Sequence, residues 1–124
     1  LRETGKSGYE AGSVKSCLLF LCLKGESIMS LFDNAQRFQT LGITTETINN
    51  GKFQREIYEA MRRFKSLDWG DVSETDTESN NEAVKTFGMV LGAYNTSKGK
   101  IWIIAESSTG NEYDRLTVLF PNEY

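Results

Sequence analysis

Residues 87–124, FGMVLGAYNTSKGKIWIIAESSTGNEYDRLTVLFPNEY, decide the fold of this chain. The segment predicts three strands, at residues 87–96, 100–107 and 113–120, because β-branched and aromatic residues dominate each run and polar residues separate them. Ser97-Lys98-Gly99 is predicted as the tight connection between the first two strands. The sequence therefore predicts a three-stranded antiparallel meander.

Side-chain alternation assigns the residues of the meander to two faces. Ile101, Ile103 and Ala105 should point to one face, and Trp102, Ile104 and Glu106 to the other, because successive strand residues alternate. We expect Leu116, Val118 and Phe120 in the buried set, and Arg115 and Thr117 on the opposite face. Tyr94 and Trp102 are expected to share that second face, where a pair of aromatic side chains favours a partner contact.

The segments before residue 87 are predicted to cover the sheet with two to four helices, which makes the fold class α+β. The clearest helix spans residues 52–65, where apolar side chains recur at helical spacing. Weaker helical patterns occur at residues 31–38, 44–48 and 73–87. The buried stripe of the clearest helix is expected to consist of Phe53, Ile57, Ala60, Met61 and Phe64.

Composition limits the chemistry that the chain can carry. Its 124 residues fit one domain and have a formal net charge of −3, which argues against a dedicated duplex-binding protein. The absence of histidine excludes Ser-His-Asp and Cys-His mechanisms and histidine-ligated zinc within these residues. Cys17 and Cys22 are too few for a disulfide framework. We expect no cofactor and a reducing, cytoplasmic setting.

Residues 1–28 differ in character from the remainder and are interpreted as a disordered leader outside the native coding sequence. Their only apolar run, residues 17–23, is far shorter than the ~20 residues needed to span a bilayer. Lys24-Gly25-Glu26 can be encoded as a purine-rich ribosome-binding sequence, with Met29 as the start. A secretory signal is the alternative. Residues 29–124 are then a single small domain.

An acidic run follows the clearest helix. Asp68-Trp69-Gly70-Asp71 is predicted as a turn in which Trp69 packs inward and its indole N–H finds an acceptor. Ser73 is a candidate helix cap, with the acidic residues of positions 74–78 at the positive end of the helix dipole. A protein-partner surface and a cation site are the alternatives for these acidic residues.

Several separated motifs of residues 67–124 resemble a family of small uncharacterised bacterial proteins that are labelled only "plasmid-related". The motifs are the DWGD turn at 68–71, the strand KIWIIAE at 100–106 and the terminus TVLFPNEY at 117–124. The chain departs from the family pattern at Ala105, in the longer connection at 107–114, and in residues 29–66. The resemblance implies an accessory role on a plasmid, integrative element or phage.

Three functions are consistent with these residues. The first is non-catalytic protein binding, with a host defence system as one target, and its contact candidates are Asp68, Trp69, Asp71, Tyr94, Trp102 and Glu106. The second is nucleic-acid binding by the basic end of the clearest helix, through Arg55, Arg62, Arg63 and Lys65; the same cluster also suits the negative end of the helix dipole. The third is a carboxylate enzyme with a divalent ion held by Asp68, Asp71 and Glu106. A homodimer through the sheet face is a further possibility, and no membrane contact is expected.

Overall fold

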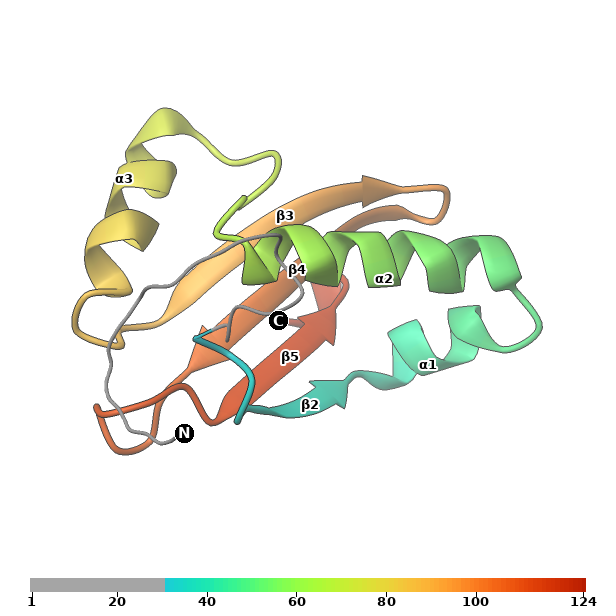
Figure 1. Cartoon of the computed structure of the whole chain (residues 1–124). Coiled ribbons are helices and arrows are strands. Elements are labelled where there is room, and N and C mark those ends of the chain that lie inside the picture. Colours follow the sequence, from blue (N-terminus) through green and yellow to red (C-terminus); the bar gives the residue numbers. More distant parts are fainter. Residues whose placement is uncertain (1–30) are drawn as a thin grey trace, which may run out of the picture. The chain divides into compact units, whose positions relative to one another are not determined.

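The computed structural model describes residues 31–124, so the predicted leader, residues 1–28, and the predicted start at Met29 lie outside the described residues. Three helices and a four-stranded sheet confirm the α+β class (Figure 1). In chain order the elements are β2 (Gln36–Gln39), α1 (Leu41–Thr47), α2 (Gly51–Lys65), α3 (Glu74–Ala83), β3 (Val90–Thr96), β4 (Gly99–Glu106), β5 (Arg115–Leu119) and a short 3-10 helix, η2 (Pro121–Glu123).

The sheet has the strand order β2-β5-β4-β3. Strands β3, β4 and β5 form the antiparallel meander that the sequence predicts. The prediction of only three strands was wrong, because β2 adds a fourth strand that runs parallel to β5. Its register pairs Gln36 with Arg115 and Phe38 with Thr117. The sheet is therefore mixed.

Residues 31–38 do not form the predicted helix. Residues 31–34 form a turn in which Ala35 N–H donates to Phe32 O at 3.0 Å, and the chain then extends as β2. The apolar residues of this segment have helical spacing, but Phe32 is 1% exposed while Phe38 is 43% exposed. Pairing with the free edge of β5 satisfies the backbone groups of this segment that face β5, which outweighs the weak local preference for a helix.

The register of the β3–β4 hairpin determines the two faces of the sheet. Thr96 pairs with Gly99, so the connecting loop is Ser97-Lys98 rather than the predicted three residues. Tyr94 therefore lies opposite Ile101 on the covered face. The prediction that Tyr94 shares a face with Trp102 was wrong, because a shift of one residue in a hairpin exchanges the faces of one strand.

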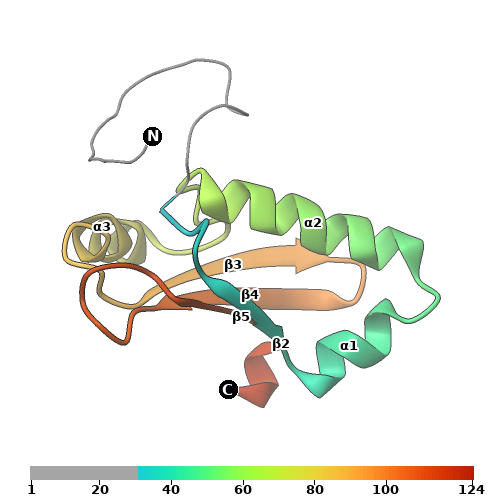
Figure 2. The same cartoon turned by 60° about the horizontal axis from the view of Figure 1, so that its bottom comes forward.

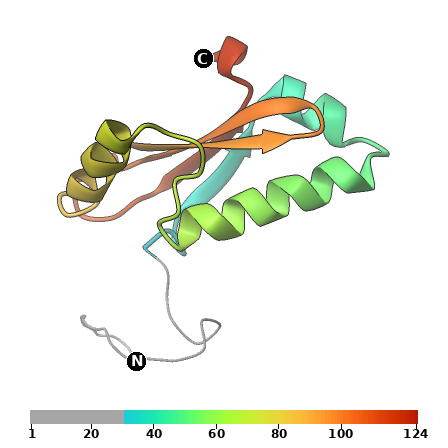
Figure 3. The same ribbon diagram turned by 90° about the horizontal axis from the view of Figure 1, so that it is seen from above.

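Helix α2 covers one face of the sheet, as Figures 2 and 3 show. Its five buried residues are the predicted stripe, Phe53, Ile57, Ala60, Met61 and Phe64. They pack in the core with covered-face residues of the strands, including Ile101, Ile103 and Val118, all 0% exposed. Asn50 caps the helix, since its Oδ1 accepts from Phe53 N–H at 3.0 Å.

The other two helices differ from the prediction in their bounds. Helix α1 begins at Leu41, three residues before the weak pattern, and contributes the buried side chain of Ile43. Helix α3 begins after Ser73, whose Oγ accepts from Asp76 N–H at 3.0 Å, which confirms the predicted cap. It ends at Ala83 rather than at residue 87 because Phe87 adopts a left-handed conformation with φ of 59°.

Candidate functional site

The predicted contact residues separate into two groups in the structure. Asp68, Trp69, Asp71 and Tyr94 lie together along the outer edge of β3. Trp102 and Glu106 lie on β4, on the face of the sheet opposite α2. The two groups therefore have different roles and are described in turn.

The DWGD turn closes the outer edge of β3. Ala93 N–H donates to Trp69 O at 2.9 Å, and Asp71 N–H donates to Ala93 O at 2.7 Å, which gives a parallel bridge between Gly70 and Ala93. From α3, the Asn80 side chain donates to Leu91 O at 2.9 Å and accepts from Leu91 N–H at 3.3 Å. The outward backbone groups of Leu91 and Ala93 are thus satisfied within the chain.

The two aromatic residues of the first group are buried. Trp69 is 3% exposed, packs edge-on against Phe64 at 5.2 Å between ring centroids, and donates from its indole N–H to Asn81 Oδ1 at 3.0 Å. The inward packing predicted for Trp69 is confirmed. Tyr94 is 2% exposed and donates from its hydroxyl to Asp68 O at 2.7 Å, and desolvation raises the pKa of this phenol. Neither side chain is accessible to a partner.

The two carboxylates of the turn are held by basic side chains. Asp68 accepts from Arg63 Nε at 2.8 Å, and this hydrogen bond lowers the pKa of Asp68. Asp71 accepts from Lys100 Nζ at 3.1 Å, which lowers the pKa of Asp71. Lys100 and Glu106 lie near opposite ends of β4, so Asp71 and Glu106 are not brought together. Within residues 31–124, no three acidic or sulfur ligands gather in a group suited to a metal ion.

The face opposite α2, here called the open face, carries the other predicted residues, Trp102 and Glu106. The short helix η2 lies on this side of the sheet and contacts β4 (Figure 2). Trp102 makes an edge-to-face contact with Tyr124 at 5.8 Å, and Tyr124 is 76% exposed. The strand residues whose side chains reach solvent on the open face include Gln36, Phe38, Trp102, Glu106, Arg115 and Thr117.

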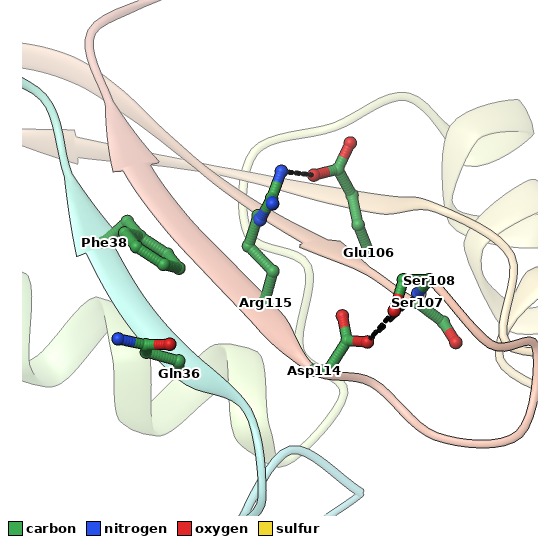
Figure 4. A pocket seen from close by; sticks show the side chains of 7 residues that line it. All are labelled: Gln36, Phe38, Glu106, Ser107, Ser108, Asp114 and Arg115. Atoms are coloured by element: carbon green, nitrogen blue, oxygen red, sulfur yellow. Dashed lines mark hydrogen bonds and ion pairs between the residues drawn. The ribbon is translucent and has the colours of Figure 1, made fainter.

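One end of the open face is hollowed into a shallow pocket of about 480 Å³. Figure 4 shows Phe38 and Gln36 of β2 on one side of the pocket and Glu106 of β4 on the other, with Arg115 of β5 between them. The guanidinium of Arg115 lies over the Phe38 ring at 5.6 Å and pairs with Glu106 at 3.7 Å. Both side chains of this ion pair are largely solvent-accessible, so it contributes little to stability and is free to exchange partners.

Of the predicted nucleic-acid residues, two are already paired on α2. Arg63 binds Asp68 and lies over the Tyr94 ring at 5.3 Å, and Arg62 forms an ion pair with Glu59 one turn earlier. Arg55 and Lys65 are exposed. The sequence analysis missed Tyr58, which is 70% exposed between Arg55 and Arg62. The sequence did contain a signal for the exposure of Tyr58, because this residue lies outside the apolar stripe of α2.

The carboxylate of Glu123 joins η2 to the start of α1. It accepts from Thr40 Oγ1 at 2.5 Å, from Gly42 N–H at 2.9 Å and from Phe120 N–H at 3.0 Å. The hydrogen bond from Thr40 is the main cause of a lowered pKa for Glu123, and the backbone donors lower it further. Glu123 is therefore a structural residue, whereas Tyr124 beside it is exposed.

Substitution Glu123→Gln is expected to lower the free energy of unfolding at pH 7 by about 1 kcal/mol, because one amide oxygen cannot replace a carboxylate that accepts three hydrogen bonds. A lowered pKa gives stability that is present above the unfolded pKa of about 4.3 and is lost as the pH falls through the folded pKa. The difference between the variant and wild type, measured by urea unfolding, should therefore shrink as the pH falls below about 4.3. Glu112→Gln, in an exposed loop, is the control; equal stability of Glu123→Gln and wild type at pH 7 would contradict the role of this carboxylate.

No helix within residues 31–124 has the length and apolar character needed to cross a bilayer. Comparisons with protein-family models, with curated proteins and with solved structures found no match.

Proposed function

We propose that this chain is a small non-catalytic accessory protein of a plasmid, integrative element or phage, and that it binds a host protein, such as a component of a defence system, through the open face. The resemblance of residues 67–124 to plasmid-related proteins supports the accessory role. The open face supports the mode of action. The observation that carries this proposal is the contact between the half-buried ring of Trp102 and the exposed ring of Tyr124, since aromatic side chains on an accessible surface are typical anchors of protein interfaces.

The charged groups of the open face suit a polar rim around that aromatic anchor. Glu106 and Arg115 are solvent-accessible and only loosely paired at 3.7 Å, so each can exchange its partner for a group on another protein. Phe38 adds a second exposed aromatic ring beside them. The open face thus combines apolar contact area with charges that can select a partner.

The carboxylates give no support to acid catalysis. A general acid near neutral pH needs a carboxyl group whose pKa is raised. Every shifted carboxyl pKa among the described residues is lowered instead, because each group accepts hydrogen bonds: Glu56, Glu59, Asp68, Asp71, Asp114 and Glu123. None of these six carboxyl groups therefore has the raised pKa of a general acid.

The test is a tagged pulldown from bacterial lysate with nuclease treatment, in which Tyr124→Ala is compared with Tyr58→Ala. The two tyrosines have similar exposure, 76% and 70%, and Tyr58 lies on α2, away from the open face. We expect one dominant protein with wild type and with Tyr58→Ala, and at least ~10-fold less of it with Tyr124→Ala. Equal recovery with both variants would contradict binding through the open face.

Nucleic-acid binding by α2 is the second candidate, and the exposure of Tyr58 favours it. An aromatic ring flanked by Arg55 and Arg62 can stack on a base while the cations contact phosphates. In this case the outcome of the pulldown is reversed. Tyr58→Ala captures no material, Tyr124→Ala captures as much as wild type, and nuclease treatment removes the captured material. Binding to single strands should then weaken steeply with salt.

A further inference from the structure

The two edges of the sheet are treated differently by the chain. The β3 edge is closed by the DWGD turn and by Asn80, as described above. On the opposite side, β2 is the last strand of the sheet, and no described strand lies beyond it (Figures 1 and 2). An edge strand with unpaired backbone groups is a template for pairing with another chain.

The hydrogen bonds between β2 and its neighbours show which backbone groups of β2 point outward. Gln36 N–H donates to Asp114 O at 3.0 Å, and Thr40 N–H donates to Val118 O at 3.1 Å. The backbone groups of the even-numbered residues of this strand therefore point toward β5. Backbone groups alternate in direction along a strand, and Arg37 and Gln39 must therefore direct their N–H and C=O groups away from the sheet. Between them lies Phe38, 43% exposed on the open face.

This arrangement is self-complementary about a two-fold axis at Phe38. In an antiparallel pair of two β2 strands, Arg37 faces Gln39 of the second copy, and each such pair exchanges two backbone hydrogen bonds. Phe38 then faces Phe38 of the second copy as a non-hydrogen-bonded pair, where side chains approach most closely. No like charges are directly opposed, and Arg37 meets an amide that it already contacts within the chain, at 3.5 Å.

We propose that β2 is a self-association edge, at which a second copy of this chain pairs antiparallel to residues 36–39 and joins the two sheets into one. A second copy fits better than an unrelated strand because one two-fold rotation satisfies every group at this edge. It pairs the outward backbone groups of Arg37 with those of Gln39, places the Arg37 guanidinium beside the Gln39 amide, and brings the two Phe38 rings together. The strand has only four residues, so the dimer is weak and depends on concentration. This edge is distinct from the aromatic pair of the proposed function.

Cysteine cross-linking tests the register directly, with purified full-length protein in which Cys17 and Cys22 are replaced by serine. Phe38→Cys places two sulfurs across the two-fold axis, where the expected Cα separation of about 4.5 Å permits a disulfide. Gln36→Cys is the matched control on the same strand and face, but its two copies would be ~13 Å apart. We expect disulfide-linked dimer from Phe38→Cys and not from Gln36→Cys; equal cross-linking of both, or none of either, overturns the proposal.

Sedimentation equilibrium provides a second test that uses no cross-link. Arg37→Pro removes an outward N–H while leaving the hydrogen bonds of β2 to β5 intact, since proline is tolerated where an edge N–H faces solvent. Arg37→Ala retains that N–H. We expect Arg37→Pro to weaken the dimer at least ~10-fold and Arg37→Ala to weaken it much less. A wild-type protein that stays monomeric up to ~1 mM, or equal effects of the two substitutions, contradicts pairing at β2.

Discussion

Replacement of Gly70 by alanine is expected to lower the free energy of unfolding by about 2–4 kcal/mol. Gly70 has φ of 78°, a conformation that L-residues rarely adopt. A Cβ at this position would lie 2.1 Å from Ala93 O and 2.7 Å from the Tyr94 ring, so the bridge that closes the β3 edge would have to open. Urea unfolding followed by circular dichroism measures the change.

The control for Gly70 is Gly99→Ala. Gly99 also has a positive φ, 102°, but a Cβ there meets no atom within 4 Å. This variant isolates the backbone strain, which we expect to cost about 1–2 kcal/mol. If Gly99→Ala proved as costly as Gly70→Ala, the close approach of the DWGD turn to Ala93 would not be a major source of stability.

Phe64→Ala is expected to destabilise the domain by about 3–5 kcal/mol, a large part of the total stability of about 5–15 kcal/mol that is typical of a domain. Phe64 is 0% exposed and its ring lies 5.0 Å from that of Phe32 and 5.2 Å from that of Trp69. Removing it leaves a cavity where α2, the turn after it and the sheet meet, and those elements cannot all move inward to fill it. Thermal and urea unfolding give the measurement.

Tyr58→Ala, on the outer surface of the same helix, is the matched control for Phe64→Ala. Its side chain is 70% exposed, so we expect a change within about 0.5 kcal/mol. This result is also needed for the pulldown comparison, which requires that Tyr58→Ala be folded. Comparable losses in the two variants would mean that the ring contacts of Phe64 are not what stabilises the domain.

The elements with strong periodicity were predictable from the sequence. The stripe of α2 and the three strands of the meander follow from spacings of 3.6 and 2 residues over long segments. Strand β2 was not predictable, because its four residues, QRFQ, show no clear alternation and all are exposed. It forms because β5 has a free edge with which it can pair. This is a tertiary interaction, and the residues of β2 alone do not indicate it.

The face assignment of Tyr94 depended on one residue in a loop. Counting Ser97-Lys98-Gly99 as the connection aligns Tyr94 with Trp102, whereas the two-residue loop aligns it with Ile101. Gly99 begins β4 with a positive φ, which this tight turn requires. The sequence alone did not show whether Gly99 would belong to the loop or would form the first residue of β4.

The candidate site was identified only in part from the sequence. Trp102 and Glu106 lie on the open face as side-chain alternation predicts, and they stay candidates for a partner contact. The other four predicted contact residues help to close the β3 edge instead: Asp68 and Asp71 form ion pairs, and the side chains of Trp69 and Tyr94 are buried. The exposure of Tyr58, Tyr124 and Phe38 depends on packing that a pattern does not reveal.

The parallel pairing of β2 with β5 also constrains the order in which the chain can fold. Gln36 has Arg115 as its register partner, and Thr40 is tied to Glu123, so the earliest described strand waits for the last described segments to emerge from the ribosome. Helix α2 and the β3–β4 hairpin rely on nearer neighbours and can form first. Such distant pairing slows folding, because a long loop must close before any contact compensates for the lost entropy. Until β5 emerges, residues 36–39 have no partner strand, and during this interval the nascent chain is most prone to pair wrongly with another chain.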